Sequence, residues 1–210
     1  MRFVKPSSED EMVYEFLKME FSSGRYREQI QRILAELRVP ERIVTHGDIA
    51  SAHENALRSD ALRLFRGYRE NRDIFHHFPA AIDWSWMLFG ADEFDRMLYM
   101  EYSYWNELSN YTGSPREAGQ TVLSGRTVFG VSNDNFHALH SKLRAGGTFP
   151  PLICLTDAEE SRYILLEGHA RCTGYALEPA LFRRVSVLLG RVTREQLYHW
   201  YGTMPKRPTA

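Results

Sequence analysis

A carboxylate, an imidazole and a guanidinium lie close together in the segment 167–171, whose sequence is Glu-Gly-His-Ala-Arg. The preceding residues 163–166 are apolar, as in a buried strand. Small and apolar residues follow the segment at helical spacing and end before Pro179. This order predicts a strand, a tight turn and the start of a helix. Such a helix start offers N–H groups and about half a positive charge to an anion.

Each residue type in this segment suits the binding of an anion. Gly168 lets the backbone turn sharply and lets a ligand come close. Arg171 can add a forked, charge-assisted contact with a phosphate or carboxylate. His169 can position a phosphate or move a proton near neutral pH. Glu167 is the candidate catalytic residue, because a carboxylate beside a bound phosphate can hold Mg²⁺ or act as a base.

A purely structural interpretation of the same segment stays open. Glycine turns before helices are common. In that case Glu167 merely favours the helix N-terminus, His169 makes local hydrogen bonds, and Arg171 lies on the surface. The two interpretations differ in whether Arg171 contacts a ligand.

The segment resembles the signature turn of the ParB/sulfiredoxin-like superfamily, in which a strand delivers a Gly-x-x-Arg turn. Residues 149–155 resemble a strand of that family, residues 157–161 a polar turn, and residues 162–166 the returning strand. Residues 184–189 resemble the strand after the signature helix. The resemblance covers roughly residues 119–190 and implies a small mixed-sheet domain with a phosphate site at the turn.

Some residues of the segment differ from the signature turn of the family, and these differences limit which activities of the family can be expected here. In the serine-kinase members an acidic residue before the turn belongs to the active site, and Glu167 matches that position. Ala170 stands where these members have the second histidine of their Gly-His-His-Arg turn. This difference weakens the argument that the chain has kinase activity. Sulfiredoxin activity is not expected, because that reaction needs a cysteine where His169 stands. Cys172 lies beyond Arg171 and does not substitute for it.

Duplex DNA and membrane are not expected partners. The formal net charge is −1, from 26 basic and 27 acidic residues, which gives no global positive field for duplex DNA. About twenty residues follow Gly190, too few for the helix-turn-helix reader of ParB-type proteins. The N-terminus lacks the apolar core of a signal peptide, and no apolar run approaches the ~18 residues that span a bilayer. We expect a cytoplasmic protein with reduced thiols.

Several other clusters are interpreted as structural rather than functional. The densest basic run is interrupted by acidic residues, which is typical of a solvated face, and consists of Arg58, Arg63, Arg66, Arg69 and Arg72. A group of aromatic residues at helical spacing indicates core packing, namely Trp84, Trp86, Tyr99, Tyr102, Tyr104, Trp105 and Tyr111. His137 and His140 lack a third ligand, so no metal site is expected. Cys154 and Cys172 are expected to be small buried hydrophobes.

The first half of the chain has the patterns of amphipathic helices. Helices are predicted around residues 12–21 and 30–37, and a third after a cap at Asp48 or Ser51. In this third helix the expected apolar face consists of Leu57, Ala61, Leu64, Phe65 and Tyr68. A fourth helix is predicted over residues 92–108.

The second half of the chain begins after a change in composition. Polar and turn-forming residues cluster at 110–115 and suggest a boundary between a helical region, 1–115, and an α/β domain, 119–205. Within the latter the patterns predict a strand over 126–131, a helix over 133–144 and a short helix over 193–201, besides the elements around the turn.

The sequence therefore predicts an α+β or α/β fold, with a helical N-terminal region packed on a small mixed sheet. The expected function is binding of a nucleotide or another phosphorylated small molecule at residues 167–171, with phosphoryl transfer or hydrolysis as the possible reaction and Mg²⁺ as the possible cofactor. The alternatives are a regulatory or interaction protein without catalysis and a nucleic-acid-acting protein. The oligomeric state stays open.

Overall fold

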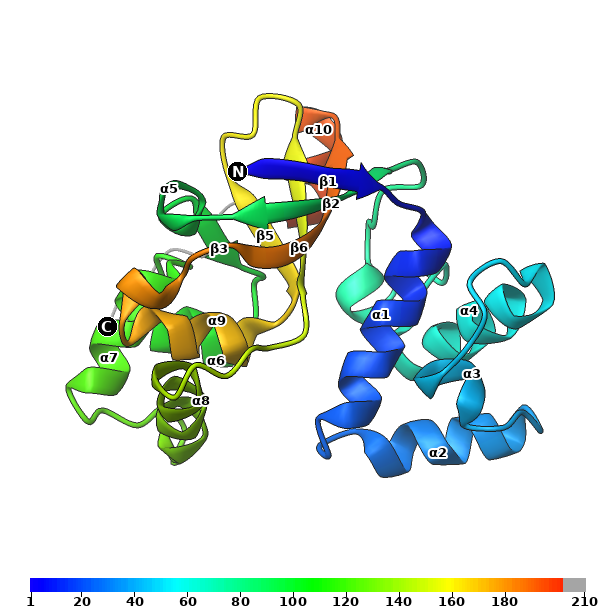
Figure 1. The fold of residues 1–210 in the computed structure, drawn as a ribbon, viewed down its shortest axis with the longest axis horizontal. Coiled ribbons are helices and arrows are strands. Elements are labelled where there is room, and N and C mark those ends of the chain that lie inside the picture. Colours follow the sequence, from blue (N-terminus) through cyan, green and yellow to red (C-terminus); the bar gives the residue numbers. More distant parts are fainter. Residues whose placement is uncertain (202–210) are drawn as a thin grey trace. The chain divides into compact units, whose positions relative to one another are not determined.

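The structure is a computed structural model that describes residues 1–201, in which the chain divides into two compact units. One unit is formed by Pro6–Trp84. The other combines Met1–Lys5 with the described chain from Ser85 onward. The fold is α+β, with a helical N-terminal region and a six-stranded mixed open sheet (Figure 1).

The helical unit contains four α-helices and a 3₁₀ turn among the described residues. They are α1 (Glu9–Ser22), α2 (Arg27–Glu36), α3 (Arg42–Thr45), α4 (Ala52–Arg66) and η1 (Asp73–Phe75). The Ser51 hydroxyl caps α4 by accepting the Glu54 N–H at 3.3 Å, and Gly67 ends that helix at φ 76°. The predicted helices around 12–21, 30–37 and after Ser51 are confirmed.

The sheet has the strand order β1-β2-β6-β4-β5-β3. Its strands are β1 (Arg2–Pro6), β2 (Asp83–Phe89), β3 (Met97–Tyr99), β4 (Leu152–Asp157), β5 (Tyr163–Glu167) and β6 (Val185–Val192). The central strand β4 runs parallel to β6 and antiparallel to β5, while β3 runs parallel to β5. Every residue of β4 is buried, as expected for a central strand that is covered on both faces.

The helices of the sheet unit are short. They are α5 (Ala91–Phe94), α6 (Ser103–Leu108), α7 (Pro115–Leu123), α8 (Asp134–Arg144), α9 (His169–Ala176), η2 (Pro179–Leu181) and α10 (Arg194–Tyr201). Helix α9 packs against α7 and α8, and α10 packs against β4. In Figure 1 helices α6 to α9 gather on one side of the sheet. Their apolar side chains share a core with alternate residues of the strands, among them Cys154, Leu165 and Val187.

The elements predicted around the turn are confirmed. Strands lie at β4, β5 and β6, near the predicted ranges 149–155, 162–166 and 184–189. The helices predicted over 133–144 and 193–201 are α8 and α10. These elements are recognisable because each is a short apolar run, or a periodic stretch, bounded by turn residues.

The single helix predicted over residues 92–108 is wrong, because the segment forms α5, β3 and α6. In β3, Met97 lies opposite Tyr163 and Tyr99 lies opposite Leu165 in a parallel ladder. Pairing with β5 therefore overrides the helical spacing of the apolar residues. Trp84 and Trp86, which precede this segment, lie in strand β2.

The strand predicted over 126–131 is also wrong. Phe129 and Gly130 have positive φ of 50° and 71°, and only Val128 and Val131 form an isolated bridge. The apolar residues on both sides of Gly130 therefore belong to a tight turn, in which Phe129 is 69% exposed.

The contacts divide the chain between Trp84 and Ser85, whereas the predicted boundary at 110–115 lies inside the sheet unit. There the segment forms a hydrogen-bonded turn between α6 and α7. The buried Ser109 hydroxyl accepts the Gly113 N–H at 3.0 Å, and the Gly113 carbonyl accepts the Tyr99 N–H at 2.8 Å. Turn-forming residues mark this connection, but tertiary contacts decide that it joins two elements of one unit.

Candidate functional site

The candidate site begins where strand β5 ends. Cys154 of β4 lies opposite Leu165 and Ile153 lies opposite Glu167, so Leu166 is an extra residue in the ladder. A β-bulge of this kind redirects the side chains at the end of a strand and is frequent beside binding sites. The chain then turns at Gly168, which has φ 104° and is the N-cap of α9. The predicted order of strand, turn and helix is thus present.

Gly168 is required by both its conformation and its surroundings. Its positive φ is one that residues with a side chain rarely adopt. A Cβ atom at this position would overlap the Leu152 side chain and would lie 3.1 Å from Arg171 Nη2. The absence of a side chain therefore lets the guanidinium of Arg171 lie across the start of its own helix.

Glu167, the last residue of β5, and Arg171 in the first turn of α9 form an ion pair between Oε2 and Nη2. Both side chains are largely buried, with 16% and 12% of their surfaces exposed. Burial raises the pKa of Glu167, and the charge of Arg171 and the Gly168 N–H oppose that rise. The carboxylate thus occupies the position near the helix N-terminus where the sequence predicts a ligand anion.

His169 belongs to a group of stacked aromatic rings. Its ring centroid lies 5.2 Å from that of Trp105 and 5.6 Å from that of Tyr99, at small interplanar angles of 24° and 25°. The Tyr99 hydroxyl lies 2.7 Å from Thr173 Oγ1, and Thr173 donates to the His169 carbonyl at 2.8 Å. Ring packing and this hydrogen-bond chain therefore fix the position of His169 beside the turn.

The two cysteines are buried and not disulfide-bonded, as the sequence predicted. Burial raises the pKa of both Cys154 and Cys172, which favours the neutral thiol. Cys172 Sγ lies 4.0 Å from the sulfur of Met97 inside the core. Neither thiol has the exposure or the lowered pKa of a reactive cysteine.

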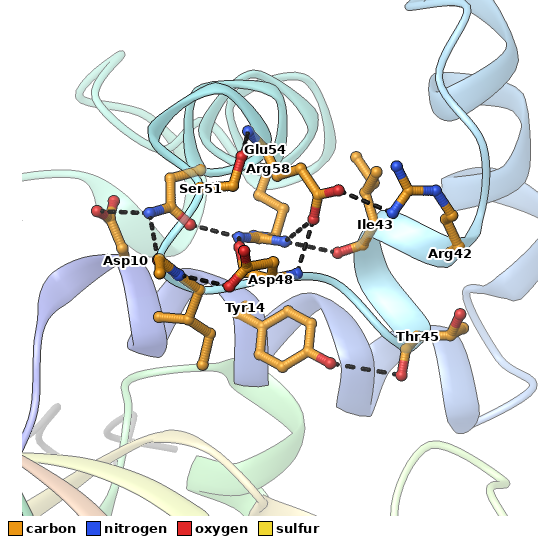
Figure 2. Close-up of polar contacts among 12 residues, drawn as sticks. Asp10, Tyr14, Arg42, Ile43, Thr45, Asp48, Ser51, Glu54 and Arg58 are labelled. Carbon is orange, nitrogen blue, oxygen red and sulfur yellow. Dashed lines mark hydrogen bonds and ion pairs between the residues drawn. The ribbon is translucent and has the colours of Figure 1, made fainter.

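Arg58 is the residue that the sequence interpretation placed wrongly. It was assigned to a solvated face, but its side chain is completely buried in the helical unit. Its Nη1 donates to the Ile43 carbonyl at 2.9 Å, and its Nη2 donates to the Asp48 carbonyl at 2.8 Å and to Asn55 Oδ1 (Figure 2). The guanidinium also lies 5.0 Å from the centre of the Tyr14 ring.

Glu54 completes this buried polar network. Its Oε2 accepts the Asp48 N–H at 2.7 Å and lies 3.4 Å from Arg58 Nη1, and its Oε1 accepts from Arg42 at 2.8 Å (Figure 2). The network holds the loop between α3 and α4. A signal for it exists in the sequence, because Arg58 lies three and four residues before the buried Ala61 and Leu62, on the apolar face of α4.

Three other arginines of the basic run agree with the predicted solvated face, namely Arg63, Arg69 and Arg72, whereas the Arg66 side chain is only 19% exposed and does not. Arg63 pairs with Asp60 and Glu70, and Arg72 pairs with Glu70 at 2.7 Å. Arg66 lies 3.3 Å from Asp73.

The histidine pair of α8 does not gather metal ligands. His140 Nε2 lies 3.0 Å from Glu178 Oε2, which also pairs with Arg144 at 3.5 Å. Within residues 1–201 there is no group of three or more His, Cys, Asp or Glu side chains arranged to hold a metal ion. Over the same residues, no helix has both the length and the apolar character that crossing a membrane requires.

Comparisons with known proteins do not assign this chain to a protein family. No protein family, curated protein or solved structure was found to match it. The resemblance to the ParB/sulfiredoxin-like superfamily therefore stays a prediction, which the order of elements around Gly168 motivates.

Proposed function

We propose that the protein binds a nucleotide or another phosphorylated small molecule at the start of α9. The observation that carries the proposal is the geometry of the turn, where a bulged strand ends at Glu167, Gly168 is left-handed, and the Arg171 guanidinium crosses the helix N-terminus. A guanidinium beside the positive end of a helix is electrostatically unfavourable unless an anion joins it. Glu167 supplies that anion in the absence of a ligand.

Ligand binding at this site requires exchange of one anion for another. The incoming phosphate replaces the Glu167 carboxylate as the partner of Arg171 and accepts hydrogen bonds from the first N–H groups of α9. The first hydrogen bond within the helix runs from the Cys172 N–H to the Gly168 carbonyl at 2.8 Å. The N–H groups in question belong to residues before Cys172. The displaced carboxylate is then beside the phosphate, where it can contact Mg²⁺ brought by a nucleotide or act as a base. Phosphoryl transfer or hydrolysis is the reaction class that this placement favours.

One observation favours a non-catalytic function on the same fold. The ion pair satisfies both charges without a ligand, and both side chains are largely buried. A regulatory or interaction protein would keep such a pair closed as part of the helix start. The two functions differ in a measurable way, since only the first requires Arg171 to bind an external anion.

The experiment that tests the proposal is a nucleotide panel measured by thermal shift and calorimetry on the full chain, with and without Mg²⁺. Arg171→Ala should weaken binding by about ten- to a hundredfold, the loss of one charge-assisted hydrogen bond. Arg183→Ala is the matched control, because Arg183 is exposed and donates only to the nearby Ala180 carbonyl at 2.6 Å. An affinity that Arg171→Ala leaves unchanged would show that the site is not at the turn.

The Glu167→Gln variant shows whether the Glu167 carboxylate takes part in catalysis or only competes with the ligand for Arg171. If Glu167 holds Mg²⁺ or acts as a base, turnover falls sharply while nucleotide affinity changes little. If it only competes for Arg171, affinity rises in the variant and there is no turnover to lose. The panel also includes sugar phosphates. Failure of every nucleotide and sugar phosphate to stabilise the wild-type chain would contradict the proposed function and leave the non-catalytic alternative.

A further inference from the structure

The helical unit contains a cavity of about 550 Å³ that the proposed function does not use. It lies between the start of α1 and the residues that follow α4. Three aromatic residues are among those that line it, namely Tyr68, Phe75 and Phe78. Charged and polar side chains line it as well, namely Glu9, Arg69 and Asn71. A concave apolar site with a few polar groups is the usual form of a small-molecule site.

The aromatic wall is well packed. Tyr68 and Phe75 are buried, and their ring centroids lie 5.2 Å apart in an edge-to-face arrangement. Phe78 contacts Phe75 in the same way, with centroids 4.9 Å apart. Tyr68 and Phe75 hold Phe78 from behind, and Phe78 is the half-buried ring that the cavity offers to a ligand. Its exposed part favours contact with a flat aromatic group.

The charged groups of the cavity are a cation and an anion at close range. Arg69 Nη2 lies 3.8 Å from Glu9 Oε1, which is a long ion pair, and 63% of the Arg69 side chain is exposed. Glu9 also accepts the hydroxyl of Tyr68, so its carboxylate is held at the cavity. A ligand that carries a carboxylate and an ammonium group on one carbon would satisfy both charges.

The loop that borders the cavity is built from tight turns. Arg69 and Asn71 both have positive φ, 60° and 52°, and Asp73 and His77 nearby have φ of 51° and 57°. Asn, Asp and His adopt left-handed conformations more readily than most residues, as is typical of turns. Asn71 Oδ1 accepts the His77 N–H at 2.6 Å and so closes the loop around the cavity.

We propose that this cavity binds an aromatic α-amino acid. The ring lies against Phe78, the carboxylate pairs with Arg69, and the ammonium pairs with Glu9. This site shares no residue with the turn at Gly168, so the two proposals can fail separately.

The first experiment compares three ligands on the full chain by calorimetry and by line broadening in ligand-observed NMR. They are phenylalanine, phenylacetate, which lacks the ammonium group, and phenethylamine, which lacks the carboxylate. Phenylalanine should bind saturably, and each of the others should bind at least about tenfold more weakly, because one charge of the cavity then stays unmatched. Equal affinity for the three ligands, or no saturable binding of phenylalanine up to about 10 mM, would overturn the proposal.

The second experiment places the ligand with variants. Arg69→Gln and Glu9→Gln should each weaken phenylalanine binding at least about tenfold, and both retain a polar side chain. Glutamine at position 9 still offers an acceptor to Tyr68, so the thermal stability of that variant is expected to stay close to that of the wild type. Arg32→Gln is the matched control, since Arg32 is an exposed arginine of the same unit that lies on α2, outside the cavity. Unchanged affinity in Arg69→Gln, or an equal loss in the control, would show that the cavity is not the site.

Discussion

At the scale of single residues, Arg58 has the clearest energetic role. Its fully buried guanidinium donates to two backbone carbonyls and to Asn55, and it lies beside Glu54. A buried charge is costly, but these partners and the Tyr14 ring offset its desolvation. The side chain therefore acts as a polar core residue that fixes the loop leading into α4.

Removing Arg58 should be strongly destabilising. Arg58→Met keeps much of the side-chain volume but leaves the carbonyls of Ile43 and Asp48 without their donor. We expect the free energy of unfolding to fall by about 3–5 kcal/mol in urea titrations. The exposed Arg32→Met should change it by less than about 0.5 kcal/mol. A loss below about 1 kcal/mol in Arg58→Met would show that the network contributes little.

Glu167 predicts a pH dependence of anion binding. Burial raises its pKa, so the carboxylate is neutralised at a higher pH than an exposed glutamate. As the pH falls through that pKa, Glu167 stops competing for Arg171, and affinity for a dianion of fixed charge should rise. Sulfate titrations from neutral to mildly acidic pH measure this. Glu167→Gln should bind sulfate with a weaker pH dependence, whereas the same slope in both proteins would exclude Glu167 as the cause.

At the scale of elements, the approach of α7 to α9 depends on a glycine. A Cβ atom at Gly119 would lie 2.6 Å from the Ala176 carbonyl oxygen and 2.8 Å from the Ala176 Cβ. Both contacts are too close for ordinary packing, and the facing atoms belong to the backbone or to a Cβ, which cannot rotate away. Helix α9 carries the candidate site, so this contact also positions the turn.

Gly119→Ala should therefore destabilise the protein although alanine is the better helix former. The overlap should exceed the propensity gain of about 1 kcal/mol and lower the free energy of unfolding by about 1–3 kcal/mol. Gln120→Ala is the control, because Gln120 is the exposed neighbour in the same helix. Thermal and urea unfolding measure both variants. A stabilised Gly119→Ala would mean that α7 can move away from α9 without cost.

At the scale of the whole molecule, the sheet is assembled from distant parts of the chain. The strands β1 to β3 come from residues 2–99, and β4 to β6 come from residues 152–192. In the sheet, β6 lies beside β2, and β5 lies beside β3. The part of the chain that resembles the superfamily thus contains only half of the strands.

A fragment of residues 119–205 should fail to fold for this reason. It lacks three strands, so β5 and β6 would each expose an edge together with apolar surface. We expect aggregation or poor dispersion in size-exclusion chromatography and NMR, with the full chain as the reference. A monodisperse fragment with a dispersed amide spectrum would show that the second half of the chain is independent.

The sequence by itself determined the local elements around the turn. Apolar runs bounded by turn residues located β4, β5 and β6, and helical periodicity located α1, α2, α4 and α8. The need for a left-handed residue between β5 and α9 explains why the glycine at position 168 was informative. These features are predictable because they depend on neighbours within a few residues.

Only the tertiary structure decided how these elements are used. Residues 97–99 form a strand because β5 lies beside them, and Arg58 is buried because the loop between α3 and α4 presents carbonyl groups to it. The spacing of Glu167 and Arg171 permits an ion pair, but burial decides that the carboxylate occupies the helix start. Each of these outcomes depends on the environment that the fold creates around a residue, which local patterns do not specify.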